Sequence, residues 1–324
     1  MIAPIVLNDN LVDLIVDAGS SVGAPAKITV SPETKYLRVI NRVRTGPADS
    51  GSDGDITVDS LNRDGSRTIV VTGRKRLGGP PGLLTYKVAE PERFAAAGLE
   101  RALAEAGVVA GSATSSRAPV NGDYTADRLV ADHVSPPFAE AVKVILKVSQ
   151  NLHASMMPYL VGALSRGGKS AEDGFDAERE FLMKAGLDIS GAVQSDGAGG
   201  AALYTPDFVV SFLQYVAKQK SAAAFQKRLP ILGVDGTLAK ISRGSAAAGH
   251  VYAKTGTFVD GDLLNRGLVV QGKGLAGYIT TKSGRRLAFA VYINRIKLND
   301  PAQVQTLVGQ AVGDIAAAVY DVVP

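Results

Sequence analysis

Two short stretches of the sequence combine polar residues that could do chemistry. The first is Lys254-Thr255-Gly256, a lysine followed by a small hydroxyl residue and a glycine. On a strand, this order would make a binding edge for an anionic group. The ammonium would attract a carboxylate, the hydroxyl would donate to it, and the glycine would let a substrate backbone approach closely. Because the triplet is short, its significance as a motif depends on the residues around it.

The second stretch is Ser149-Gln150-Asn151. It interrupts two apolar helical segments, because the apolar stripe expected over 137–148 stops there and a second one continues through Leu164. Two polar residues separated by one position could form an ordinary helix cap with a buried hydrogen bond. They could also face a substrate. The residues alone leave both interpretations open.

The elements around Lys254 predict a sheet that would hold it in place. Residues 274–281 and 286–295 are rich in β-forming residues and flank a tight turn at Ser283-Gly284, as in a β-hairpin. We expect the strand that carries Lys254 to pair with this hairpin.

A length of 324 residues predicts about two domains. Residues 1–118 contain short strand-like runs between Gly- and Pro-rich turns, among them a hairpin over 56–72, and end in a helix. They are expected to form a β-rich accessory domain. Residues 119–324 are expected to form the second domain. Its further helices are predicted over 137–148, 172–185, 208–218 and 301–322.

Composition excludes several classes of function. The formal net charge is +4 and the basic residues are dispersed, so no nucleic-acid partner is expected. The absence of cysteine excludes disulfides and thiol chemistry. His133, His153 and His250 show no metal-ligand spacing, and we expect no metal or other cofactor. No apolar run approaches the ~20 residues of a transmembrane segment, and no signal peptide is expected.

Together, the two polar stretches resemble the second and third motifs of the penicillin-recognising serine transferases. Their surroundings are similar to those of the class C low-molecular-mass penicillin-binding proteins, which are D-alanyl-D-alanine carboxypeptidases and endopeptidases. The similar segments are, in chain order, Ser135-Pro136-Pro137, 143–152, 196–199, 235–238 and 253–257. Residues 8–10 and 24–27 also resemble the accessory β region that this family inserts into its catalytic domain.

The resemblance implies an α+β fold. Its parts would be a β-lactamase/transpeptidase-like αβα catalytic domain with a mainly antiparallel sheet and an N-terminal β-rich inserted accessory domain. It also implies acyl transfer on peptidoglycan stem peptides, in which an active serine attacks the carbonyl of the penultimate D-Ala and water releases the acyl group. β-Lactams would acylate the same serine. Such proteins are periplasmic or otherwise extracytoplasmic.

The resemblance assigns catalytic roles to three residues. Ser149 would relay a proton toward the leaving amine, assisted by a neighbouring lysine. Asn151 would hydrogen-bond the acyl side of the substrate and hold it in line. Because these roles require a shared substrate, we expect Ser149, Asn151 and Lys254 to converge on one cleft.

The resemblance assigns substrate binding to the Lys254 strand. Lys254 and Thr255 would recognise the terminal carboxylate of the peptide, beside Gly256. The backbone N–H of Thr257 would serve as half of an oxyanion hole.

The sequence departs from the family at the first motif, Ser-x-x-Lys, whose serine is the nucleophile. No serine in the sequence has a lysine three residues on. The sequence therefore looks like the C-terminal part of a longer enzyme with an incomplete catalytic domain, and we expect the chain alone to be inactive. Ala198 and Gly200 also replace a serine and a leucine that are usual in the family.

Two other interpretations use the same residues differently. One is a non-catalytic cell-wall-binding or interaction protein built on the same scaffold. The other is an unrelated basic binding module, which only the net positive charge favours.

Overall fold

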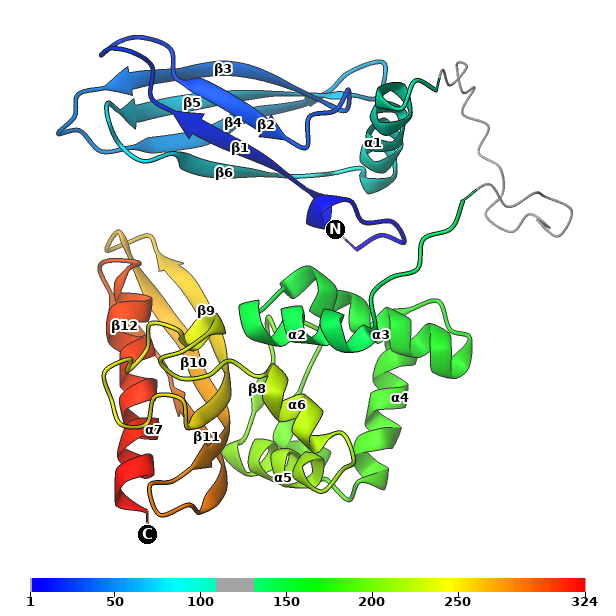
Figure 1. The fold of residues 1–324 in the computed structure, drawn as a ribbon, viewed down its shortest axis with the longest axis vertical. Coiled ribbons are helices and arrows are strands. Elements are labelled where there is room, and N and C mark those ends of the chain that lie inside the picture. The colour runs from blue at the N-terminus through cyan, green and yellow to red at the C-terminus, as the bar shows by residue number, and fades with distance from the viewer. Residues whose placement is uncertain (1, 109–130, 324) are drawn as a thin grey trace, which may run out of the picture. The chain divides into compact units, whose positions relative to one another are not determined.

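The computed structural model describes residues 2–108 and 131–323 (Figure 1). The chain divides into two compact units, Met1–Val130 and Ala131–Pro324, and each is described by itself. The boundary predicted near residue 118 lies outside the described residues.

The first unit contains two three-stranded sheets. In one of them, β1 (Leu11–Asp17) lies between β2 (Lys27–Ser31) and β6 (Gly82–Lys87), and both pairings are antiparallel. Every second residue of β1 is buried and the residues between are half-buried. This period of two matches the loose alternation of its sequence.

In the other sheet, β5 (Arg67–Arg76) lies between β3 (Leu37–Gly46) and β4 (Asp53–Leu61). Strands β4 and β5 form the antiparallel hairpin that the sequence predicts over 56–72. Strand β3 pairs with β5 in parallel. No local pattern indicates that pairing, because the two strands are distant in the chain.

Helix α1 (Pro91–Glu105) packs against these sheets and completes the core of the first unit. Phe94 is fully buried, and its ring centroid lies 5.5 Å from that of Tyr36. Glu90 precedes the helix and accepts hydrogen bonds from the Tyr36 hydroxyl at 2.8 Å and from Arg67 at 2.6 Å. These contacts tie the start of the helix to β5 and to the residue before β3.

Helices make up the first part of the second unit (Figure 1). They are α2 (Phe138–Val148), α3 (Asn151–Arg166), α4 (Ala171–Lys184), α5 (Pro206–Ala217) and α6 (Ala222–Arg228). The start of α5 follows local chemistry. The Thr205 hydroxyl accepts the backbone N–H of Phe208 at 3.2 Å, and Pro206 occupies the first helical position.

The sheet of the second unit is organised around β10 (Gly267–Thr280). Strand β9 (Val251–Asp262) pairs along one side, and β11 (Arg286–Ile293) and β12 (Ile296–Leu298) pair along the other, all antiparallel. The predicted pairing of the Lys254 strand with the hairpin is therefore confirmed. The strand expected to begin at residue 274 begins earlier, at Gly267, so β9 and β10 form a longer hairpin than the pattern indicated.

Helices cover both faces of this sheet (Figure 1). Helix α7 (Gln310–Val322) packs its Val312 and Ala316 against Leu275 and Ile279 of β10. On the other face, α5 is held by the hydroxyl of Tyr278, which donates to the carbonyl of Leu213 at 2.8 Å. The helix expected over 301–322 is not a single α-helix, because α7 is preceded by a π-helical segment at Val304–Gly309.

Short elements complete the second unit: a two-stranded ribbon of β7 (Ala192–Val193) and β8 (Leu203–Tyr204), and 3-10 turns at Ile189–Gly191 and Gly236–Leu238. In the first unit, a 3-10 turn at Asn8–Asn10 precedes β1. No helix in the described part of the chain is both long and apolar enough to cross a membrane.

Candidate active site

The two polar stretches meet in the second unit. Lys254 lies on β9, and its Nζ donates to the Oγ of Ser149 at 2.8 Å and to the backbone carbonyl of Thr255 at 2.7 Å. Ser149 lies 105 residues earlier, between α2 and α3. The contact connects the edge of the sheet to the helical part of the unit.

The loop that holds Ser149 has an unusual backbone. Ser149 follows the last residue of α2 with φ 60° and ψ 52°, in the left-handed region. A residue other than glycine adopts this conformation at a cost of about 1 kcal/mol or more. Gln150 then caps α3, because its side-chain oxygen accepts the N–H of Leu152 at 2.8 Å. The helix-cap interpretation therefore applies to Gln150, whereas Ser149 contacts Lys254.

Asn151 is the first residue of α3 and is exposed. Among the described residues, none makes a hydrogen bond to its side chain. The structure therefore brings Ser149 and Lys254 together, and the convergence of Asn151 on the same cleft stays a prediction.

An ion pair holds the end of α2 against the segment before β9. Nζ of Lys147 lies 2.7 Å from Oδ1 of Asp235, and the same oxygen accepts the N–H of Ile231 at 2.9 Å. Gly236 has a positive φ of 58°, and a Cβ added there would lie 2.5 Å from the carbonyl oxygen of Lys147. The residue after Asp235 must therefore be a glycine for this segment to lie so close to the end of α2. Ser149, two residues after Lys147, is placed by this packing.

Hydroxyl groups follow Lys254 along β9. The Thr255 hydroxyl donates to the hydroxyl of Thr237 at 3.1 Å, and the Thr257 hydroxyl accepts from Nζ of Lys273 at 2.8 Å. Gly256, between the two threonines, is exposed, and a Cβ added there would meet no atom within 4 Å. The strand thus offers threonine side chains beside an open stretch of backbone.

The electrostatics of the site are positive. Burial, together with repulsion from Lys273, lowers the pKa of Lys254 to about 8. Burial also lowers the pKa of Lys273. Within the described ranges, neither ammonium forms an ion pair with a carboxylate. One buried and one half-buried amine, both held by neutral oxygen atoms, favour an anionic ligand nearby.

Sequence reasoning missed Lys147, Asp235, Thr237 and Lys273 as parts of this arrangement. Lys273 carried a signal, since it is a lone charge between glycines in a strand whose next residues are apolar. Lys147 and Asp235 lie in segments that resemble the family, but nothing in the sequence indicated that the two side chains contact each other across 88 residues. Across the residues that the structure describes, no group of three or more His, Cys, Asp or Glu side chains could hold a metal ion.

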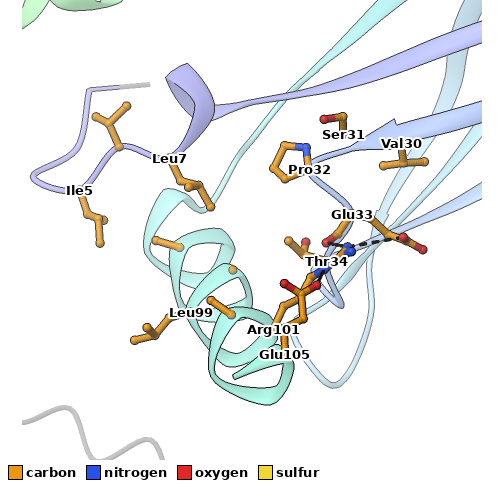
Figure 2. Close-up of a pocket in the computed structure, with 14 residues that line it drawn as sticks. Ile5, Leu7, Val30, Ser31, Pro32, Glu33, Thr34, Leu99, Arg101 and Glu105 are labelled. Atoms are coloured by element: carbon orange, nitrogen blue, oxygen red, sulfur yellow. Dashed lines mark hydrogen bonds and ion pairs between the residues drawn. The ribbon is translucent and has the colours of Figure 1, made fainter. Parts of the chain in front are cut away.

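A separate hollow of about 650 Å³ lies in the first unit, between α1, the N-terminal segment and the loop after β2 (Figure 2). Its charged groups are two carboxylates and one guanidinium that contacts both of them. Arg101 donates to Glu105 at 2.7 Å and lies 3.4 Å from a carboxylate oxygen of Glu33. None of the predicted site residues lines this hollow, so its chemistry is distinct from that around Lys254.

The comparisons with known proteins agree with the motifs. The model of the D-Ala-D-Ala carboxypeptidase 3 (S13) family matches residues 1–313. The chain is 31% identical over 302 residues to a D-alanyl-D-alanine carboxypeptidase of Actinomadura sp. (strain R39), covering 91% of this chain and 53% of that protein. It is 28% identical over 292 residues to the D-alanyl-D-alanine carboxypeptidase DacB of Haemophilus influenzae, covering 88% and 56%. The chain thus spans about half the length of these relatives.

The fold is similar to solved structures of penicillin-binding protein 4 from Haemophilus influenzae. One matches with a TM-score of 0.72 at 23% identity, covering 97% of this chain and 67% of that one. Another, in complex with a β-lactam, matches with a TM-score of 0.69 at 24% identity, covering 97% and 70%. These matches confirm the α+β fold that the resemblance implied. The chain belongs to the D-Ala-D-Ala carboxypeptidase 3 (S13) family.

Proposed function

We propose that this chain forms the substrate-recognition side of a serine-type D-alanyl-D-alanine carboxypeptidase or endopeptidase site that acts on peptidoglycan stem peptides. The observation that carries the proposal is the 2.8 Å hydrogen bond between Lys254 and Ser149, in a chain whose family is defined by D-Ala-D-Ala carboxypeptidases. β-Lactams would occupy the same site.

In this proposal, Ser149 and Lys254 form a proton relay. The hydroxyl of Ser149 accepts a hydrogen bond from Lys254, so its own proton is available to the leaving amine of the substrate. A Lys254 pKa of about 8 leaves about one tenth of the amine neutral at pH 7. Lys254 can therefore both donate and accept a proton near neutral pH. Asn151 would hold the acyl side of the substrate.

The carboxylate of the terminal D-Ala would bind along β9. Lys254 supplies the charge and Thr255 a hydroxyl, and the exposed Gly256 lets the peptide backbone approach. The backbone N–H of Thr257 would serve as half of the oxyanion hole.

The motif that carries the family's nucleophile, Ser-x-x-Lys, is absent from this sequence. Because no serine in these 324 residues has a lysine three positions on, we propose that they bind the peptide but form no acyl-enzyme by themselves. Intact-mass spectrometry after incubation with penicillin tests this point. We expect no adduct, and an acyl adduct on a serine such as Ser149 would contradict it.

Binding is the direct test of the proposed site. A tripeptide that ends in D-Ala-D-Ala is titrated into the ¹⁵N-labelled full chain, and we expect amide shifts concentrated at 254–257 and around Ser149. The same peptide ending in L-Ala-L-Ala is the matched control, since it has the same charge and composition. Equal shifts with both peptides, or shifts confined to the first unit, would contradict the proposal.

The absence of Ser-x-x-Lys favours one second candidate, a non-catalytic cell-wall-binding or interaction protein on the same scaffold. Such a protein would bind insoluble peptidoglycan without using the Lys254 site. Sedimentation with purified peptidoglycan separates the two candidates. The peptidase proposal expects Lys254→Met to weaken this binding, whereas the alternative expects no change.

The proposed function has consequences for the location of the chain and for the role of its two parts. Peptidoglycan peptides lie outside the cytoplasm, so the chain would act in the periplasm or an equivalent extracytoplasmic space. The β-rich residues 1–118 would be an accessory domain, and residues 119–324 would belong to the catalytic domain.

A further inference from the structure

Lys273 is a lysine buried within the sheet of the second unit. It lies on β10 directly opposite Thr257 in the register with β9, and only 2% of its surface is exposed. Its Nζ donates to the Thr257 hydroxyl at 2.8 Å and to the side-chain oxygen of Gln305 at 3.3 Å. Among the described residues, no carboxylate forms an ion pair with it.

An ammonium buried at this position destabilises the fold. Burying a charge without an opposite charge costs several kcal/mol. Two neutral oxygen atoms offset only part of this cost. Lys273 also repels Lys254. Packing alone therefore does not explain a lysine here.

The hydrogen bond from Lys273 restricts where the hydroxyl of Thr257 can donate its own proton. A threonine hydroxyl has one proton to donate and lone pairs that accept. Because Lys273 occupies the accepting side, the Thr257 proton must be donated elsewhere. Thr257 is exposed, and no described residue accepts that proton. A charged donor also polarises the hydroxyl and strengthens its outward bond.

We propose that Lys273 is a positioning residue that holds Thr257 with its hydroxyl proton turned toward the open edge of β9, where it donates to the carboxylate end of a bound peptide. Lys273 itself does not touch the ligand, because it is covered. The identity of the ligand in this inference rests on the proposed function. The orientation of Thr257 does not depend on it.

The surroundings of Lys273 are built to hold it. Gln305 lies in the π-helical segment Val304–Gly309, and π-helical turns are often found at functional sites. A Cβ added at Gly309 would lie 2.5 Å from the oxygen of Gln305 that receives Lys273. The glycine and the π-helical turn therefore leave room for the acceptor of the second hydrogen bond. The ammonium of Lys273, which β10 carries, is therefore held by acceptors from β9 and from the π-helical segment.

The experiment compares Lys273→Met, which keeps the length and removes the charge, with Lys273→Gln, which keeps a donor. Lys282→Met, at the exposed β10–β11 turn, controls for the loss of one charge. All are made in the full chain, and thermal melting confirms that each is folded. Two properties are measured: the χ1 rotamer of Thr257 from three-bond NMR couplings, and the Kd of a D-Ala-D-Ala tripeptide and of its C-terminal amide.

We expect a single Thr257 rotamer in the wild-type chain and in Lys282→Met, and averaged couplings in Lys273→Met. Affinity for the free carboxylate should fall about tenfold in Lys273→Met and less in Lys273→Gln, with little change for the amide. Thr257→Val should produce the same loss, and combining it with Lys273→Met should add nothing. A merely structural lysine would not show this dependence on the ligand's carboxylate.

Two results overturn the inference: an unchanged Thr257 rotamer in Lys273→Met, or additive losses in the double variant. If the wild-type chain binds neither peptide, the proposed function fails while the rotamer measurement still decides the role of Lys273. If the peptide binds and Lys273→Met has wild-type affinity and rotamer, the proposed function stands and the inference fails.

Discussion

The ammonium of Lys254 and the hydroxyl of Ser149 lie 2.8 Å apart, although 105 residues separate them in the chain. The contact connects β9 to the loop between α2 and α3. Ser149 thus contacts the sheet, whereas the neighbouring Gln150 caps α3. The left-handed backbone of Ser149 is the local strain that accompanies this placement.

Removing the charge of Lys254 should weaken recognition of the peptide carboxylate. In Lys254→Met, we expect the Kd of a D-Ala-D-Ala tripeptide to rise at least about tenfold, because a charge-assisted bond is lost. The fold should be retained, since the substitution also removes a desolvated charge. NMR titration and thermal melting measure the two effects. Wild-type affinity in a folded Lys254→Met chain would contradict the assignment of Lys254.

The lowered pKa of Lys254 predicts how stability depends on pH. The folded value of about 8 lies below the usual value of about 10.4, so the unfolded chain binds this proton more tightly. The destabilisation is complete below pH 8 and shrinks as pH rises toward 10.4. Between pH 8 and 9.5, before tyrosines ionise, Lys254 should add about 1–2 kcal/mol to the free energy of unfolding.

Urea unfolding of the wild-type chain and of Lys254→Met at pH 8.0, 8.75 and 9.5 measures this contribution as a difference. The wild-type chain should gain stability relative to the variant across the series. Parallel curves, or a relative loss for the wild-type chain, would show that the pKa of Lys254 is not lowered.

The ion pair of Lys147 and Asp235 should control the position of Ser149. In Asp235→Ala, Lys147 loses its partner and the N–H of Ile231 loses its acceptor, which we expect to cost about 2 kcal/mol. The amide signals of Ser149 and Lys254 should also shift. Glu180→Ala, which breaks the more exposed pair with Arg166, is the control and should cost less than about 1 kcal/mol. Equal costs, with unmoved Ser149 signals, would argue against this role.

The second unit carries an open edge and exposed apolar side chains that should cause self-association. Among the described strands, β11 pairs with β10 alone. Leu164 on α3 is 87% exposed, and Phe138 and Val148 on α2 are more than half exposed. Such surfaces favour association. Sedimentation velocity should show oligomers that grow with concentration and diminish in Leu164→Glu. A concentration-independent monomer would contradict this prediction.

Local chemistry made much of the secondary structure predictable. Thr205 and Pro206 mark the start of α5, the apolar alternation marks β1, and Ser283-Gly284 marks the turn between β10 and β11. In each case the decisive interactions join residues close in the chain, so a short window of sequence contains both partners. The two motifs likewise carry the family resemblance in a few consecutive residues.

The tertiary structure alone decided which distant groups meet. The parallel pairing of β3 with β5, the contact of Lys147 with Asp235 and the burial of Lys273 against Thr257 and Gln305 all join segments whose approach depends on the packing of the whole unit. A lysine in a sequence is equally compatible with solvent, with an ion pair or with a buried amine. Which of these it becomes depends on the dielectric and the partners that the fold supplies, and no neighbouring residue reports them.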